Sequence, residues 1–175
     1  GGHSGIFVNS HIPSRRLLLR TTLQAVAATI FLHHRLTISS VYLPPSQNIT
    51  KPQLVELVSQ LPSPFLLLGD FNARHPLWGD SVASQRGKMI ASYLQQYSVS
   101  LLNTNQPTAY HIQTHTFSNI DLSLCSPELC LDFSWSPLEG LYGSDHYPIL
   151  LSSQDSPNLS PPPPSWSLPR ADCYS

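Results

Sequence analysis

The stretch LLLGDFNA, residues 66–73, determines the expected architecture. With Phe65 it begins as a continuous apolar run between turn formers, which is typical of a strand buried on both faces. The run ends in Asp70 and Asn72, which project to the same side if the backbone stays extended. Strand ends of α/β sheets often bind ligands. Asp and Asn are also ordinary turn residues, so a capped turn is an equally good interpretation.

The segments around this strand predict more strands than helices. Residues 50–61 and 86–97 have apolar residues at helical spacing, and the first segment offers Thr50 as N-cap with Pro52 in the first turn. The pattern indicates an α/β protein with helices outside its sheets. The strands are predicted at residues 5–9, 15–20, 24–31, 36–43, 65–69, 100–102, 115–117, 120–124, 132–135 and 147–151.

Composition limits both the number of domains and the classes of function. Of the 175 residues, 41% are hydrophobic and 11% are charged, well below the usual charged share of about 25%. This excludes a highly charged disordered chain. The net charge of −1 gives no general attraction to nucleic acid, so any such contact must be local. We expect one domain at residues 1–152 and a Ser/Pro-rich linker or tail at residues 153–175.

Cysteine usage and hydropathy indicate the compartment. The three cysteines are odd in number and lack the paired spacing of a zinc site, which favours reduced thiols in an intracellular protein. The longest weakly polar stretch, residues 23–32, is too short for the roughly 18 residues of a membrane span. We therefore expect no membrane association.

A second stretch with chemical potential is GSDHYPI, residues 143–149. It places the carboxylate of Asp145 beside the imidazole of His146, just before a predicted strand. Histidine titrates near neutrality and can protonate a phosphoryl oxygen. A neighbouring Asp can bind a hard cation or hold the ring. A Ser-Asp-His triplet that lies on the surface by chance is the simpler alternative.

Two further strand residues are candidates. Asp121 is a lone acid in the apolar strand IDLSL, where a charge costs free energy unless it is paired. It either faces water at a sheet edge or pairs with a cation such as His146. Tyr42, before Pro44-Pro45, either donates to a phosphate or is a core or rim aromatic. Acids, an amide, a His and a Tyr at several strand ends together suit metal-assisted phosphodiester hydrolysis.

Six sequence blocks in fixed order resemble one family. The chain is similar to the endonuclease/exonuclease/phosphatase superfamily, and most closely to the apurinic-type endonuclease domain of jockey-like non-LTR retrotransposons of arthropods. The blocks are GGHSGIFVNSHIPSR (1–15), SVYLPPSQ (40–47), LLLGDFNARHPLWGD (66–80), LLNTNQPTAY (101–110), FSNIDLSLCSP (117–127) and GSDHYPIL (143–150).

The resemblance implies a fold and a reaction. The fold would be a four-layer α/β sandwich, DNase I-like, of two mixed β-sheets flanked by helices. The reaction would be hydrolysis of a DNA phosphodiester with Mg²⁺ or Mn²⁺, leaving a nick with a 3′-hydroxyl that primes reverse transcription. The implied setting is nuclear, and the chain would be a monomer in solution. The full-length element would supply a reverse transcriptase domain.

The resemblance also assigns roles to single residues. Asp70 would activate the attacking water or assist the leaving group, and Asn72 would orient the nucleophile. His146, held by Asp121, and Tyr42 would contact the scissile phosphate. The resemblance further places Asp145 at the metal. It places four residues at the DNA: Arg74, His75, Trp78 and Ser118. Trp78 is equally suited to anchor a loop.

The chain also departs from the family pattern. Family members have a first strand with an Asn and a second with a Glu, the chief metal ligand, before the glycine turn at which this sequence starts. We therefore expect an N-terminally truncated copy that lacks the first strands. Two alternatives follow: a catalytically inactive remnant that at most binds DNA or protein, and another phosphoesterase of the same superfamily acting on a phosphoinositide or a sphingolipid.

Overall fold

A computed structural model of the chain describes residues 4–153 and 172–174. In chain order its elements are β1 (Ile6–Val8), β2 (Ser14–Leu17), β3 (Gln24–Phe31), β4 (Arg35–Tyr42), α1 (Lys51–Ser59), β5 (Phe65–Asp70), the 3₁₀ turn η1 (Pro76–Trp78), α2 (Gln85–Gln96), β6 (Ser100–Leu101), β7 (Ala109–His111), β8 (Thr116–Ser118), β9 (Asp121–Cys125), the 3₁₀ turn η2 (Pro127–Leu129), β10 (Phe133–Pro137), β11 (Ile149–Ser153) and β12 (Asp172–Tyr174).

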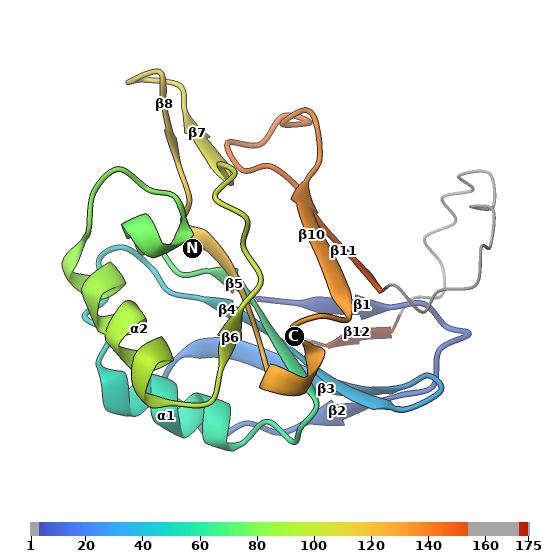
Figure 1. Ribbon diagram of the computed structural model, residues 1–175. Coiled ribbons are helices and arrows are strands. Elements are labelled where there is room, and N and C mark those ends of the chain that lie inside the picture. The colour runs from blue at the N-terminus through green and yellow to red at the C-terminus, as the bar shows by residue number, and fades with distance from the viewer. Residues whose placement is uncertain (1–3, 154–171, 175) are drawn as a thin grey trace.

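A six-stranded sheet forms the centre of the molecule (Figure 1). Its strand order is β2-β3-β4-β5-β9-β6, and the sheet is mixed because β4 and β5 run parallel while the other neighbours are antiparallel. Parallel neighbours need a crossover, which α1 supplies between β4 and β5. The predicted apolar strand is thus central in this sheet.

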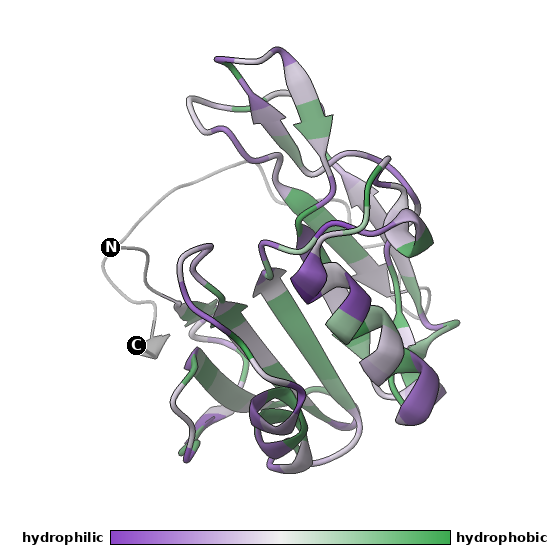
Figure 2. Cartoon of the chain, turned by 90° about the vertical axis from the view of Figure 1, so that its left-hand side faces the viewer, coloured by the Kyte–Doolittle hydropathy of each residue, from purple (hydrophilic) through white to green (hydrophobic). Residues whose placement is uncertain are grey.

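The two faces of this sheet pack against different layers. Alternation along β5 sends Leu67 into the core under α1 and α2, while Leu66 and Leu68 face the opposite core. That second core is covered by two antiparallel ribbons, β1–β12 and β10–β11. In Figure 2 long hydrophobic stretches follow the central strands, whereas the helices mix hydrophilic and hydrophobic residues. This explains why the β5 sequence is apolar without a period.

Both helices begin directly after a capping residue. Gln53 Oε1 accepts hydrogen bonds from the backbone N and the hydroxyl of Thr50 at the start of α1, so the expected N-cap is confirmed. Ser84 caps α2 by accepting from the backbone N–H of Gly87. Helix α2 starts one residue earlier than the sequence predicted.

Several strand predictions need correction. The strand β7 was not predicted, because its antiparallel pairing with β8 makes it a strand, and its own residues show no hydrophobic period. Nor was β12 predicted, which pairs with β1 and is the last strand of the chain. The strand expected at 132–135 lies at Phe133–Pro137, and the one expected at 147–151 lies at Ile149–Ser153. The second sheet appears as two separate ribbons instead of one mixed sheet.

The remaining global expectations concern cysteines and membranes. Cys125 and Cys130 are free thiols, and burial raises the pKa of Cys125 to about 12. Within residues 4–153 and 172–174, no helix has the length and apolar character needed to cross a bilayer. The prolines expected to form a tail lie within residues 154–171, outside the described part of the chain.

Candidate active site

Sheet register brings three candidate residues into one row. Tyr42 ends β4 and is paired with Asp70 at the end of β5. Asp70 is in turn paired with Asp121 at the start of β9. Directly paired residues on neighbouring strands project from the same face of a sheet. The phenol and the two carboxylates therefore lie side by side at one end of the central sheet.

A histidine joins this row from a loop. His146 Nδ1 lies 2.8 Å from Asp121 Oδ2, and a backbone bridge pairs His146 with Ala109 at the start of β7. The Asp121 hydrogen bond and charge raise the pKa of His146 to about 9, although burial acts in the opposite direction. The ring is thus an imidazolium at neutral pH, with Nε2–H directed away from Asp121. The pairing interpretation of Asp121 is confirmed.

Asp70 and Asn72 form a compact unit. The backbone N–H of Asn72 donates to Asp70 Oδ1 over 2.8 Å, and Asn72 Nδ2 donates to Asp70 Oδ2 over 2.8 Å. The expected extended backbone is wrong at Asn72, whose φ of 47° is left-handed; Asn tolerates this region better than most residues. The capped-turn interpretation therefore describes the backbone, while the carboxylate still lies in the row of strand ends.

The protonation of Asp70 reflects its surroundings. Burial raises the pKa of Asp70, and the neighbouring charge of Asp121 acts in the same direction. The hydrogen bonds from Asn72 and the charge of His146 act in the opposite direction. A carboxyl group with a raised pKa next to an imidazolium is suited to exchange a proton with a reacting oxygen.

The carboxylates and the histidine of the row do not by themselves form a complete site for a divalent cation. In the part of the chain that the structure describes, no group of three or more His, Cys, Asp or Glu side chains could hold a metal ion. Mg²⁺, however, is often bound by one or two carboxylates together with substrate phosphates. Asp145, which is exposed and whose Oδ1 is 4.0 Å from His146 Nε2, is of the donor type that such a site uses. Its role as a metal ligand stays a prediction.

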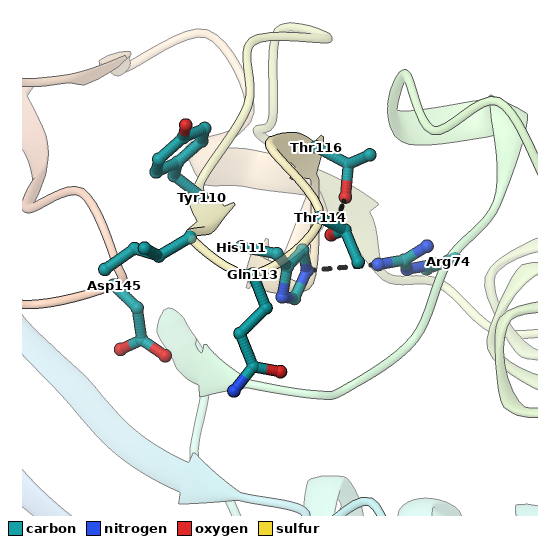
Figure 3. A pocket seen from close by; sticks show the side chains of 8 residues that line it. Arg74, Tyr110, His111, Gln113, Thr114, Thr116 and Asp145 are labelled. Carbon is teal, nitrogen blue, oxygen red and sulfur yellow. Dashed lines mark hydrogen bonds between the residues drawn. The ribbon is translucent and has the colours of Figure 1, made fainter.

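An open cavity of about 690 Å³ lies beside Asp145, under the β7–β8 hairpin. Figure 3 shows Arg74 directed toward His111 among the residues that line the cavity, with Arg74 Nη2 3.0 Å from His111 Nε2. The same His111 nitrogen is 2.9 Å from Ser118 Oγ, and Arg74 Nε is 4.0 Å from Asp80 Oδ2. One guanidinium therefore connects the loop after β5 to the hairpin.

Comparison with known proteins gives this site its context. A model of the family described as endonuclease–reverse transcriptase matches residues 36–150, the range that contains the whole row and His146. The chain belongs to the endonuclease–reverse transcriptase family.

Relatives of known type agree with this membership. A probable RNA-directed DNA polymerase from transposon BS of Drosophila melanogaster is 33% identical over 134 residues, which cover 73% of this chain and 14% of that protein. The RNA-directed DNA polymerase from mobile element jockey of Drosophila funebris is 30% identical over 134 residues, covering 76% and 14%. The chain thus spans about one seventh of the length of these relatives.

A solved structure supports the fold. The endonuclease domain of TRAS1, a telomere-specific non-LTR retrotransposon, superposes with a TM-score of 0.74 at 22% identity, covering 83% of this chain and 70% of that one. The α/β, DNase I-like architecture expected of an endonuclease–reverse transcriptase protein is confirmed.

Two residues expected at the DNA are instead interior supports of the endonuclease fold. Trp78 is fully buried and its Nε1–H donates to the carbonyl of Ala73, so it anchors the loop after β5 rather than stacking on a base. Ser118 is 2% exposed and its hydroxyl contacts His111. The loop-anchor interpretation of Trp78 therefore describes the structure, whereas the burial of Ser118 was not predicted, because a sequence does not reveal whether a side chain turns inward.

The other two residues expected at the DNA, Arg74 and His75, are partly exposed. Arg74 is half-buried and lines the cavity beside Asp145. His75 Nδ1 accepts from the backbone N–H of Leu77 and its ring lies 5.2 Å from that of Trp78, so its first role is to shape η1. A direct DNA contact is still a prediction for both.

Several residues that support the site were not predicted from the sequence. Thr108 Oγ1 accepts from the backbone N–H groups of Ile120 and Asp121, and Asn103 Nδ2 donates to the carbonyl of Asp121. Arg86 donates to four backbone carbonyls near the site. These residues act on backbone groups, for which no motif exists. Asn103 and Thr108 both stand in the block LLNTNQPTAY, which was singled out for its family resemblance, whereas Arg86 stands in none of the six blocks.

Proposed function

We propose that the chain is a DNA endonuclease that hydrolyses one phosphodiester with the help of Mg²⁺ or Mn²⁺ and leaves a 3′-hydroxyl. In a full-length element this end would prime a reverse transcriptase. The main support is the row Tyr42–Asp70–Asp121 completed by the His146–Asp121 hydrogen bond. It brings a carboxylate of raised pKa and an imidazolium to one strand end, in a family of endonucleases.

The proposed roles follow from charge and reach. Imidazolium Nε2–H of His146 donates to a non-bridging oxygen of the scissile phosphate and stabilises the charge that develops there. Asp121 keeps the ring protonated and oriented, as a carboxylate does for a catalytic histidine. Asp70, fixed by Asn72, takes a proton from the attacking water. Tyr42 donates to the same phosphate from the next strand.

The metal would bind at the acidic edge of this row. Asp145 would hold it together with a phosphate oxygen, and the ion would supply charge neutralisation at the leaving oxygen. With this one carboxylate we expect a weak affinity, so that activity would require Mg²⁺ at about millimolar concentration.

The test is nicking of supercoiled plasmid by the purified protein, with Mg²⁺, Mn²⁺ or EDTA. Variants Asp70→Asn and His146→Ala should lose the activity. The matched controls Asp132→Asn and His33→Ala change exposed residues in turns far from the row and should keep it. Extension of the nick by a DNA polymerase without prior end repair identifies a 3′-hydroxyl.

Each other outcome assigns a different function. Metal-dependent binding of DNA without nicking, by protein whose circular dichroism is that of an α/β fold, would make the chain a binding module. Release of phosphate or a headgroup from phosphoinositide or sphingolipid substrates, with no nicking, would make it another phosphoesterase of the superfamily. Nicking that persists in EDTA would contradict the metal assignment alone.

A further inference from the structure

Two loops leave the row of strand ends and must be held in place. One begins with Leu43 directly after Tyr42, and the other begins with Phe71 directly after Asp70. Backbone hydrogen bonds tie their first residues, from Leu43 N–H to the carbonyl of Asp70 and from Phe71 N–H to the carbonyl of Ile120. Beyond these residues the sheet ladder ends, so another group must fix the loops.

That group is the guanidinium of Arg86, in the first turn of α2. Its Nη1 donates to the carbonyls of Leu43 and Phe71, each over 2.9 Å. Its Nη2 donates to the carbonyls of Pro44 over 2.8 Å and Gln47 over 2.6 Å. One side chain therefore satisfies four acceptors, three in the loop after β4 and one in the loop after β5.

We propose that Arg86 is a positioning residue, whose guanidinium fixes the loops after β4 and β5 relative to each other and thereby holds the Asn72 amide against the Asp70 carboxylate. The importance of that contact rests on the proposed function. The holding of the two loops by Arg86 does not depend on the proposed function, and it can be measured in protein without nuclease activity.

A continuous chain of contacts leads from Arg86 to the Asp70 carboxylate. The carbonyl of Leu43 that accepts from Arg86 also accepts from Asn72 Nδ2 over 3.1 Å. The same amide nitrogen donates to Asp70 Oδ2. A shift of the Leu43 carbonyl therefore moves or releases the amide that holds the carboxylate.

Helix α2 leaves the guanidinium little freedom. A Cβ at Gly87 would lie 1.9 Å from the carbonyl oxygen of Arg74, so only glycine allows the helix to approach the loop backbone this closely. Ser84 Oγ accepts from the backbone N–H groups of Gly87 and Arg74, which ties the same turn to the same loop. Residues 84, 86 and 87 thus form one docking surface for the loop after β5.

Arginine is suited to this position for geometric reasons. Its guanidinium is planar and has five N–H donors in a fixed fork, whereas a lysine ammonium has three donors at one point. Leu43 and Phe71 are fully buried, so carbonyls that lose their donor here are costly to leave unpaired. With four bonds to carbonyls, Arg86 is committed to the protein and is not a phosphate ligand.

Amide hydrogen exchange tests the holding of the loops. In Arg86→Lys, exchange in residues 43–48 and 71–75 should accelerate at least about tenfold together, while β3 at 24–31 stays unchanged. The control Lys88→Gln changes an exposed cation two residues further along the same helix and should leave all three segments as in the wild type. Acceleration of neither loop, or of one alone, would overturn the proposal.

Kinetics tests the consequence for catalysis. For nicking of a short duplex, Arg86→Lys should lower kcat about 10- to 100-fold with KM changed less than about threefold. In an Asn72→Ala background the same substitution should have a much smaller effect, because the amide link is already lost. An unchanged kcat, or full additivity with Asn72→Ala, would refute positioning through this link.

The two proposals fail in different ways. If the folded wild type does not nick DNA, the proposed function fails, and the exchange data alone decide whether Arg86 fixes the loops. If the wild type nicks DNA and Arg86→Lys nicks it equally well with loosened loops, the positioning proposal fails and the proposed function stands.

Discussion

The two halves of the candidate site differ in how they are held. Tyr42, Asp70 and Asp121 sit on neighbouring strands whose pairing fixes their relative positions. His146 and Asp145 sit on the loop between β10 and β11, where residues 142–145 are exposed, and reach the row through one bridge and one short hydrogen bond. The sheet half is set by the fold as a whole, whereas the loop half depends on a few local contacts. Backbone clashes in the first half should therefore act mainly on stability, whereas loss of the contacts that hold the second half should act mainly on activity.

The sheet half should be broken by Gly69→Ala. Gly69 has a φ of 151°, and a Cβ there would lie 1.8 Å from the carbonyl oxygen of Val41 on β4. Relief of that clash would separate β4 from β5, at a cost of about 4 kcal/mol or more in the free energy of unfolding. Urea denaturation followed by circular dichroism measures this loss. Wild-type-like stability would mean that the strand pairing tolerates displacement.

The link between the two halves should be broken by Asp121→Asn. The amide has nearly the shape of the carboxylate but cannot keep His146 charged, so nicking should fall about 100-fold or more while the protein stays folded. Single-turnover nicking assays measure the rate, with Asp132→Asn as the control of equal charge change. Retention of more than half of the wild-type rate would contradict the role of the pair.

The same hydrogen bond should make stability depend on pH. Because the pKa of His146 is raised to about 9, above the unfolded value near 6.5, its stabilisation is complete below about pH 6.5 and is lost as the pH rises through about 9. The expected loss is roughly 2 kcal/mol after allowance for partial exposure. Denaturation at pH 6, 8 and 10 should show the wild type approaching Asp121→Asn at high pH. A constant difference between the two would exclude this linkage.

The smallest effect is expected at the hairpin. His111→Ala removes the contact of Arg74 with β7 and leaves the row of strand ends intact. KM for a short duplex should rise about three- to tenfold at unchanged kcat. The control Thr114→Ala changes an exposed residue at the tip of the same hairpin. A fall in kcat would instead connect the hairpin to the chemical step.

Much of the fold could be predicted from the sequence because local patterns agreed with the tertiary structure. The alternation in LTISSVYL and the apolar run before Asp70 placed β4 and β5 within one residue of their bounds. Thr50 was found as N-cap because capping has a local chemical cause. The strands β7 and β12 were missed because their partners, not their own residues, make them strands.

Within the site, only the contacts of residues in recognisable sequence motifs could be predicted. The pairing of Asp121 with His146 was anticipated because an acid in an apolar strand needs a cation nearby. The burial of Trp78 was left open because it depends on packing. No sequence pattern marks the four carbonyls that Arg86 contacts, since every residue has the same backbone acceptor.

The pairing of β1 with β12 has a consequence for protein synthesis. Ile6 pairs with Tyr174 (Figure 1), and these residues are 168 positions apart (174 − 6). A ribosome that adds about 5–20 residues per second needs roughly 8–34 s to make the second after the first. Throughout that time the hydrogen-bonding edge of β1 that β12 later fills is open to other strands, including those of neighbouring nascent chains. Slower translation lengthens this interval, so the yield of folded protein should depend on synthesis rate and on chaperones that shield nascent strands.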